Sequence, residues 1–369
     1  MARLSWRSVG IWGATFVVAG AAVAACSASA DDDRRVRADD DDDGGTSGVG
    51  GDDSTGSGID LTGGVGGGST VCTDVGCIDA GVQGGCDQGI NVAAADPMDG
   101  ARAMGLCADV ATAGWGVTDA RWVKADGSPL DGAQLALGHG VLPSFGPNVL
   151  PQEGGTMLAL SSGTARQPAD AGYEPVSGYP KDPFPHVSPP GYPKESPSCP
   201  GVITGDPYDS AGLELRIKTP INAKSLRFNL NFYTYEFPIY ICDTYNDFFV
   251  ALMTPKPVDL PDGNISFDGL GNTISVNAGF LEVCLPQTAG GKNFPCALGA
   301  AELSGTGFEG AAATSWLETT APVENPGEEI TLRFTIWDSG DGVLDSTTLL
   351  DNFRFDAEEG TSGTIPVPR

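Results

Sequence analysis

The sequence predicts an all-β protein: a jelly-roll-like β-sandwich with long loops and one short N-terminal helix, preceded by a disordered tether. Glycine (53 residues) and proline (27 residues) are abundant in the chain of 369 residues, as expected for many turns. Short segments in which apolar and polar residues alternate recur along the chain, and long helical patterns are rare. Short strands separated by turns are typical of sandwiches and barrels.

The clearest strand signals are two stretches that alternate with period 2. In residues 226–233 (LRFNLNFY) every second side chain is large and apolar, and residues 330–337 (ITLRFTIW) repeat this pattern. One face of each strand is predicted to pack in the core, and the other, which ends in Tyr233 or Trp337, to face solvent. A slip of one residue would turn the apolar set outward, so the register is well specified.

The remaining elements follow in chain order. Asp96 is predicted to cap a helix that has Pro97 at its first position and reaches about Cys107. A hairpin is predicted between residues 265–267 and 274–276, around two Gly-containing turns. Further strands are predicted at residues 115–124, 157–160, 213–218, 248–253, 280–283 and 347–355.

The N-terminus has the pattern of an export signal. Arg3 and Arg7 precede an apolar stretch that is short for a membrane span. The stretch ends in Val-Ala-Ala-Cys26, which resembles a bacterial lipobox and implies a lipoprotein signal peptide (1–25) with Cys26 as the lipidated residue. An ordinary signal peptide cleaved near Ala30 is the alternative. Two acyl chains on Cys26 would give stable membrane anchoring.

Four further parts are predicted after the leader. Residues 26–70 form a disordered tether rich in Asp, Gly and Ser, because they have too few apolar residues for a core. The Asp runs in this tether (31–33 and 39–43) act as solvated spacers or bind calcium weakly. A small Cys/Gly-rich segment (71–95), a β-sandwich domain (96–358) and a disordered tail (359–369) follow.

The cysteines predict four disulfides. Export places the chain in an oxidising compartment, and eight of its nine cysteines remain once Cys26 is set aside. We expect the bridges Cys284–Cys296 and Cys199–Cys242, with the four N-terminal cysteines paired among themselves. The candidate residues are Cys72, Cys77, Cys86, Cys107, Cys199, Cys242, Cys284 and Cys296. A zinc site at the first three of these is a weak alternative, since no histidine is near and the spacing lacks paired CxxC motifs.

The net charge of −28 limits the partners. A strongly acidic surface repels nucleic acid and anionic lipid headgroups, so nucleic acid is excluded as a partner, and the expected membrane contact is the N-terminal lipid. Such a surface suits a soluble domain outside the cell and the binding of cations. The expected location is the cell envelope, as an outer-membrane or cell-surface lipoprotein.

Four ordered motifs resemble a known family. They are LALSSGTAR (158–166), TYEFPIYICDTYNDFFVAL (234–252), GNISF with ISVN (263–267 and 274–277), and IWDSGDGVLDSTTLLDNF (336–353). Together they resemble the choice-of-anchor L domain of bacterial surface proteins, in a variant like that of delta-proteobacterial or myxobacterial lipoproteins. The chain departs from the family pattern at Tyr235-Glu236, where two acids are usual. The resemblance implies surface display and no particular reaction.

Seven polar residues stand out because a sandwich does not need them for packing. They are Glu236, Asn246, Asp247, Asp338, Asp341, Asp345 and Asp351. Crowded carboxylates raise each other's pKa unless a cation neutralises them, and calcium takes six to eight oxygen ligands. We therefore consider a calcium site at Glu236, Asp247, Asp338, Asp341 and Asp345, with turn capping by the same acids as the alternative. Asp351 is expected to be structural.

Two function hypotheses remain. The first is a lipid-anchored, surface-displayed module for adhesion or for glycan or matrix binding, with a structural calcium. The second is a structural envelope component without a ligand. The Pro-rich segment (167–201) carries Tyr173, Tyr179 and Tyr192, which could form a sugar-stacking platform or simply cover a strand. No hydrolase or nucleotide-binding motif is present, so no enzyme is expected; a glycoside hydrolase using Glu236 and Asp247 is the weakest hypothesis.

Overall fold

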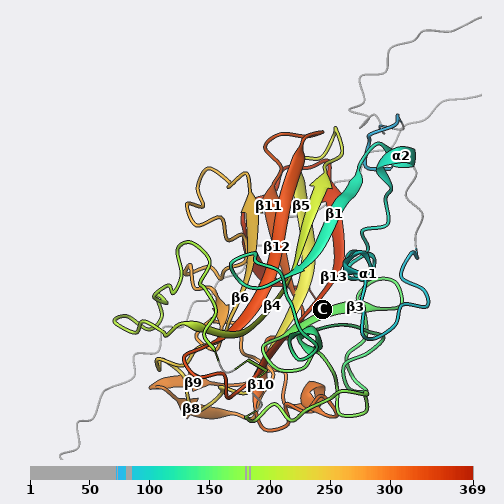
Figure 1. Ribbon diagram of the computed structural model, residues 1–369. Coiled ribbons are helices and arrows are strands. Elements are labelled where there is room, and N and C mark those ends of the chain that lie inside the picture. Colours follow the sequence, from blue (N-terminus) through green and yellow to red (C-terminus); the bar gives the residue numbers. More distant parts are fainter. Residues whose placement is uncertain (1–71, 73, 80–84, 179–180, 183, 369) are drawn as a thin grey trace, which may run out of the picture. The chain divides into compact units, whose positions relative to one another are not determined.

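The computed structural model describes residues 72, 74–79, 85–178, 181–182 and 184–368 (Figure 1). The predicted signal peptide, Cys26 and the tether lie outside these residues, as does Tyr179. All of the described residues belong to one compact unit. Within the described part of the chain, no helix has the length and apolar character needed to cross a membrane.

The fold is an all-β sandwich, as predicted. The strands are β1 (Gly116–Val123), β2 (His139–Leu142), β3 (Met157–Ser161), β4 (Pro207–Lys218), β5 (Ser225–Thr234), β6 (Phe248–Thr254), β7 (Ile274–Ser275), β8 (Gln287–Ala289), β9 (Lys292–Phe294), β10 (Ala312–Ala313), β11 (Leu317–Pro322), β12 (Glu329–Ser339), β13 (Ser346–Asp356) and β14 (Gly363–Pro366). One sheet has the order β1-β4-β12-β6-β7, and the other has the order β14-β11-β5-β13-β3-β2 with β10 added beside β5. Strands β8 and β9 form a separate hairpin.

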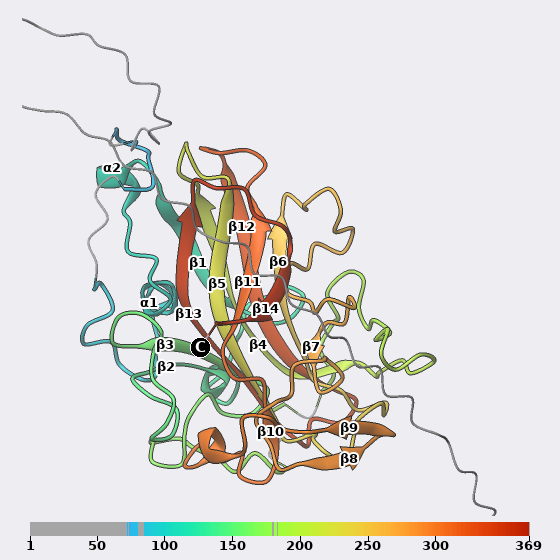
Figure 2. The same cartoon turned by 180° about the vertical axis from the view of Figure 1, so that it is seen from behind.

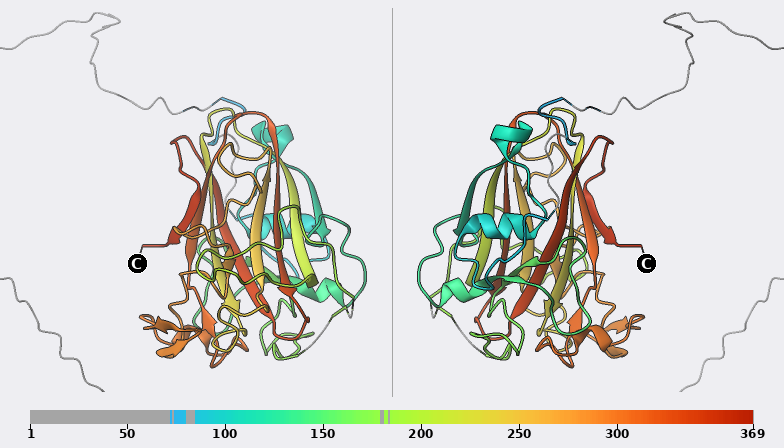
Figure 3. Two further views of the ribbon diagram at one scale, coloured as in Figure 1. Left: turned by 90° about the vertical axis from the view of Figure 1, so that its left-hand side faces the viewer. Right: turned by 90° about the vertical axis from the view of Figure 1, so that its right-hand side faces the viewer.

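The two large sheets face each other (Figures 1 and 2), and Figure 3 shows the layers from the side. Consecutive long strands alternate between the sheets, and β12 pairs antiparallel with both β4 and β6. In the same way β5 lies between β11 and β13. This alternation is the jelly-roll-like feature of the fold.

The core lies between the sheets and contains the predicted apolar faces. Phe228 of β5 and Phe334 of β12 meet edge to face with ring centroids 5.1 Å apart. Each buried side chain of this size stabilises the fold by roughly 1.5–3 kcal/mol. The alternating residues of both stretches belong to this core: Leu226, Phe228, Leu230, Phe232, Ile330, Leu332, Phe334 and Ile336.

The prediction that the opposite faces meet solvent is wrong at both strand ends. Tyr233 is fully buried, with its ring centroid 5.0 Å from that of Phe145. Trp337 is buried beneath Tyr192 of the Pro-rich segment, at 5.4 Å between centroids. Long loops therefore cover the outer faces, which the alternation within a strand does not reveal.

Two short helices precede the sandwich. The Asp96 side chain accepts the Met98 N–H, and α1 (Pro97–Ala103) begins as predicted. It ends earlier than predicted because Met104 caps it and Gly105 follows with φ 92°. The second helix, α2 (Val110–Ala113), was not predicted. The 3-10 helices are η1 (Leu135–Gly138) and η2 (Ala301–Leu303).

Two predicted strand segments differ from the structure. Residues 280–283 form no strand; Val283 makes only an isolated bridge to Ala313, since its neighbour β10 has two residues. The predicted hairpin is reduced to an isolated antiparallel bridge between Phe267 and Thr273, with the Asp268 N–H donating to the Asn272 carbonyl oxygen at 3.0 Å. The side chains of Asn264 and Asp268 accept other nearby backbone N–H groups, and β7 pairs with β6 instead.

The C-terminal tail is partly ordered, contrary to prediction. Residues Gly363–Pro366 form β14, which pairs antiparallel with β11. The buried Thr364 hydroxyl lies 2.8 Å from that of Thr319. A polar tail can thus complete a sheet edge through backbone pairing, without the apolar pattern that sequence reasoning requires.

The disulfides agree with the sequence. The bridges are Cys72–Cys77, Cys86–Cys107, Cys199–Cys242 and Cys284–Cys296. The zinc alternative for the first three cysteines is wrong, because all three are oxidised in bridges.

Candidate functional site

Six strand ends meet at one end of the sandwich, the lowest in Figure 1, where β10 is labelled. Strands β3, β5 and β12 end there, and β4, β6 and β13 begin there, as their antiparallel pairing requires. We call this the acidic end and define it by Glu236, Asp247, Asp338, Asp341 and Asp345. The structure thus brings all five predicted residues to one end of the fold, from two segments about a hundred positions apart.

The register of the strands explains why these acids lie close together. Trp337 of β12 is paired with Phe248 of β6, so Asp338 and Asp247 are neighbours on adjacent strands of one sheet. In the other sheet, the Tyr235 N–H donates to the Asp345 carbonyl oxygen at 3.1 Å, next to Glu236. A Cβ on Gly163 would overlap the Asp345 carboxylate, so glycine is required where the turn after β3 passes this acid.

Four of these acids are buried. Glu236, Asp247, Asp338 and Asp345 are each no more than 1% exposed, whereas Asp341 lies on the exposed β12–β13 loop. A buried charge without a partner is costly, and most buried polar groups therefore have one.

The buried acids lack such partners. Both carboxylate oxygens of Asp338 and of Asp345 have no hydrogen bond, nor has one oxygen each of Glu236 and Asp247. The other Asp247 oxygen accepts the Ser162 hydroxyl at 3.2 Å. The Gly342 N–H and the Ser346 hydroxyl approach Asp338 and Asp247 respectively, but neither carboxylate gains a bond of hydrogen-bonding geometry from them.

Burial and mutual repulsion change the acidity of the group. Burial, followed by the charges of Asp338 and Asp341, raises the pKa of Glu236 to about 9. Burial, with the neighbouring carboxylates, also raises the pKa of Asp247 and Asp338 well above the usual range. The pKa of Asp345 is raised by burial as well, although the charge of Lys181 opposes that shift.

Lys181 is a buried cation beside this group that the sequence did not reveal. Its Nζ donates to the Ser161 carbonyl oxygen at 2.9 Å, and the Lys181 N–H donates to Asp209 at 3.0 Å. Burial lowers the Lys181 pKa to about 8, while the charges of Asp209, Asp345 and Asp338 favour its protonated form. No periodicity marks a lysine in a Pro-rich loop, so no sequence signal could have found it.

The two remaining polar residues of the sequence prediction differ. Asn246 is 1% exposed, and neither its amide oxygen nor its amide nitrogen has a partner. Asp351 accepts the N–H groups of Gln152 at 2.5 Å and Glu153 at 3.2 Å, which is the structural role expected of it.

The oxygen-rich donor set suits a hard cation such as calcium. In the side-chain arrangement of the described residues, however, no three or more His, Cys, Asp or Glu side chains form a group that could hold a metal ion. The acidic end is thus a buried set of uncompensated carboxylates rather than a ready-made metal site. Like charges that repel keep such side chains apart.

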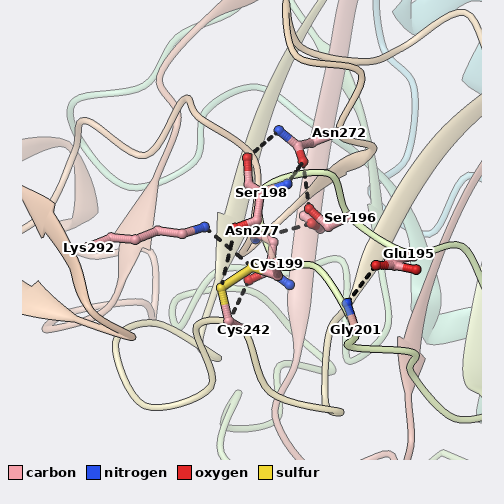
Figure 4. Close-up of a disulfide and its surroundings, with 10 residues drawn as sticks. Glu195, Ser196, Ser198, Cys199, Gly201, Cys242, Asn272, Asn277 and Lys292 are labelled. Carbon is pink, nitrogen blue, oxygen red and sulfur yellow. Dashed lines mark hydrogen bonds between the residues drawn. A yellow bond between two sulfur atoms is a disulfide. The ribbon is translucent and has the colours of Figure 1, made fainter.

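A disulfide anchors the loop that carries two of the acids (Figure 4). Cys199 of the Pro-rich segment is bonded to Cys242, which lies between Glu236 and Asp247 in the β5–β6 loop. The Cys242 N–H donates to the Asn277 side chain at 2.8 Å. On the other side of the bridge, the Asn272 amide oxygen accepts the Ser196 hydroxyl at 2.6 Å and the Ser198 N–H at 2.9 Å.

Apolar side chains are exposed on three loops at this end. Ile239 of the β5–β6 loop is 76% exposed, Phe184 before β4 is 70% exposed, and Val343 of the β12–β13 loop is 40% exposed. Tyr240 and Tyr245 are half-buried and meet edge to face at 5.4 Å between centroids. Loops at one end of a rigid sandwich commonly carry binding residues.

Comparison with known proteins does not assign the chain to a family. No protein-family model matches the chain, and no curated protein matches it. Among solved structures, the chain is similar to TmCBM61 in complex with beta-1,4-galactotriose, with a TM-score of 0.23 and 9% sequence identity. The match covers 66% of this chain and 90% of that chain. A likeness this distant says nothing about what this chain binds.

Proposed function

We propose that the protein is a lipid-anchored, surface-displayed module that binds a glycan or another matrix component through the loops of the acidic end. The observation that carries this proposal is the exposure of Phe184, Ile239 and Val343 on three loops beside the half-buried Tyr240 and Tyr245. Aromatic and apolar side chains on rigid loops are suited to stacking on sugar rings or packing against a protein partner.

Anchoring and location rest on the N-terminal sequence. The lipobox-like ending at Cys26 implies attachment to the outer membrane, and residues 26–70 would hold the domain away from it. The four disulfides support a compartment outside the cytoplasm. The resemblance to the choice-of-anchor L domain supports display on the cell surface.

A structural envelope component without a ligand is the second candidate. The burial of Tyr192 and Trp337 favours it, because these aromatic side chains stabilise the sheet instead of meeting solvent. Glu236 and Asp247, the pair that a glycoside hydrolase would use, are 1% and 0% exposed, so neither is placed to reach a polysaccharide.

The experiment is a glycan-array and matrix-binding screen of the full chain and its loop variants. We expect binding of at least one glycan or matrix fraction, weakened about tenfold or more by Phe184→Ser combined with Tyr240→Ala. The matched control is Val258→Ser, since Val258 is 84% exposed in the loop that follows the end of β6, away from the acidic end. Absence of binding, or equal loss in the control, would favour the structural role.

A further inference from the structure

Buried acids that lack partners call for a source of neutralising charge. Protons are one source, and the raised pKa values of Glu236, Asp247 and Asp338 are consistent with it. A bound cation is the other. The charged groups around each acid indicate which acids a nearby lysine already neutralises and which would need a proton or a bound cation.

The acidic end has two electrostatically different sides. On one side, Lys181 acts on Asp209 and Asp345, and the Lys181 and Asp182 N–H groups donate to Asp209 at 3.0 and 2.6 Å. On the other side lie Glu236, Asp247 and Asp338. The charges that act most strongly on Glu236 and Asp247 are those of other carboxyl groups.

Asp338 joins the two sides. It lies near enough to Lys181 for their charges to interact, yet the groups that raise its pKa after burial are Asp247, Asp341 and Asp345. Both of its oxygens are without a hydrogen bond. Glu236, Asp247 and Asp338 are therefore the acids whose charged forms are least stabilised by their surroundings, so a proton or a cation is needed there.

A hydroxyl provides an observation independent of the acids. The Ser346 side chain is fully buried, and its oxygen has no hydrogen-bond partner. It lies close enough to Asp247 to affect the acidity of that carboxyl group. A buried neutral oxygen beside a carboxyl group is a suitable additional ligand for a hard cation.

We propose that Glu236, Asp247 and Asp338 form a divalent-cation site of the calcium type, with the Ser346 hydroxyl beside it and Lys181 closing its opposite side. This site deepens the proposed function, because an ion there would fix the β5–β6 loop, which carries the exposed Ile239 and the half-buried Tyr240 and Tyr245. Asp341, on the exposed β12–β13 loop, is the acid through which an ion would first meet the group. Binding requires the three carboxylates to move together, since they do not form a ready-made metal site.

Calcium is the expected ion. Carboxylate and hydroxyl oxygens are hard ligands, and the flexible coordination of calcium tolerates a site assembled from three strand ends. Magnesium demands a near-ideal octahedron and keeps its waters, so it fits a buried, irregular set of side chains less well. Extracellular calcium modules bind with dissociation constants of about 10⁻⁴–10⁻³ M, which sets the concentration to test.

The test is thermal unfolding of the chelator-treated full chain, with and without 10 mM calcium chloride. Native-state binding raises the midpoint by mass action, and we expect a rise of about 5 °C. The variants Glu236→Gln and Asp338→Asn remove charge at nearly constant shape. They should unfold at the same or a higher temperature than the unmodified chain in chelator and lose the calcium-dependent rise.

The matched control is Asp351→Asn, which changes a buried acid that accepts backbone N–H groups away from the proposed site. It should keep the full calcium-dependent rise. An unmodified chain without the rise, or a rise that persists in Glu236→Gln and Asp338→Asn, would overturn the proposal. Calcium alone is the probe, so a failed glycan screen leaves this result unaffected, and the reverse also holds.

Discussion

Two sets of buried aspartates in this protein have opposite surroundings. Asp87 and Asp268 are 5% and 4% exposed, and their carboxylates accept several hydrogen bonds from nearby backbone. Asp338 and Asp345 are 1% exposed, and their four carboxylate oxygens accept none. Burial alone does not distinguish a structural acid from a candidate metal ligand. The number of backbone N–H groups that donate to the carboxylate does.

The pKa shifts follow this difference. Hydrogen bonds from Gly155 and Thr156 outweigh burial and lower the pKa of Asp87. At the acidic end, burial and neighbouring carboxylates act in the same direction, and the pKa of Asp338 rises. Asp87 favours its charged form without help, whereas Asp338 requires a proton or a cation.

The largest expected effect comes from removing one acid of each set. Asp268 accepts the Leu270, Asn272 and Gly279 N–H groups at 2.9 Å each. Asp268→Ala leaves these donors without a partner and should lower the free energy of unfolding by about 3 kcal/mol. Asp338→Asn removes repulsion and should leave the free energy of unfolding unchanged or raise it in chelator.

Urea unfolding of both variants measures this contrast. The midpoint should fall strongly for Asp268→Ala and not for Asp338→Asn. A large loss in both would mean that the carboxylate of Asp338 has a structural partner, and the two sets would then be alike.

A smaller effect, on calcium affinity, is expected from replacing Lys181. Lys181→Met removes the ammonium group that acts on Asp209, Asp345 and Asp338 while keeping a long apolar side chain. The ion would then meet a more negative site, and calcium affinity should increase by about tenfold. Calorimetric titration with calcium measures the change, and weaker binding in this variant would show that Lys181 supports the ion site instead of competing with it.

The smallest effect concerns the titration of single acids. Burial raises the pKa of Asp351 to about 6, in spite of its backbone hydrogen bonds. Its folded-state pKa exceeds the unfolded value, so its contribution to stability is complete below about pH 4 and is lost as the pH rises through about 6. Carbon-detected NMR should show the Asp351 carboxyl titrating near pH 6 and that of Asp87 below its ordinary pKa of about 3.8. Equal midpoints would remove the distinction between the two surroundings.

Sequence reasoning was accurate where a local pattern decides the structure. The alternation in residues 226–233 and 330–337 predicted β5 and β12 and the apolar residues that meet in the core. The Asp96-Pro97 pair predicted the start of α1. The expected oxidising compartment and the even number of cysteines predicted four disulfides, and the structure confirms the two pairings that we expected.

Sequence reasoning was inaccurate where contacts between segments far apart in the sequence determine the structure. The outer faces of both sheets are covered by long loops, so Tyr233 and Trp337 are buried on faces that alternation assigns to solvent. Strand β14 forms from a tail without an apolar pattern, because the edge of β11 offers backbone partners. The acids of the candidate site stand out in the sequence as unneeded for packing, but Lys181 joins them only through the three-dimensional fold. Ser346 directly follows Asp345 in the sequence, and only the structure shows that its hydroxyl is buried without a partner.

The most direct measurement is the calcium content of the full chain by equilibrium dialysis at 1 mM calcium, in parallel with the double variant Glu236→Gln, Asp338→Asn. For a dissociation constant of about 10⁻⁴–10⁻³ M, our account predicts that the site holds about 0.5–0.9 calcium per chain at this concentration. The double variant should lose this ion, while any weak binding by the Asp runs at 31–33 and 39–43 remains in both chains. Equal calcium content in the two chains would contradict the account and leave the buried carboxylates neutralised by protons.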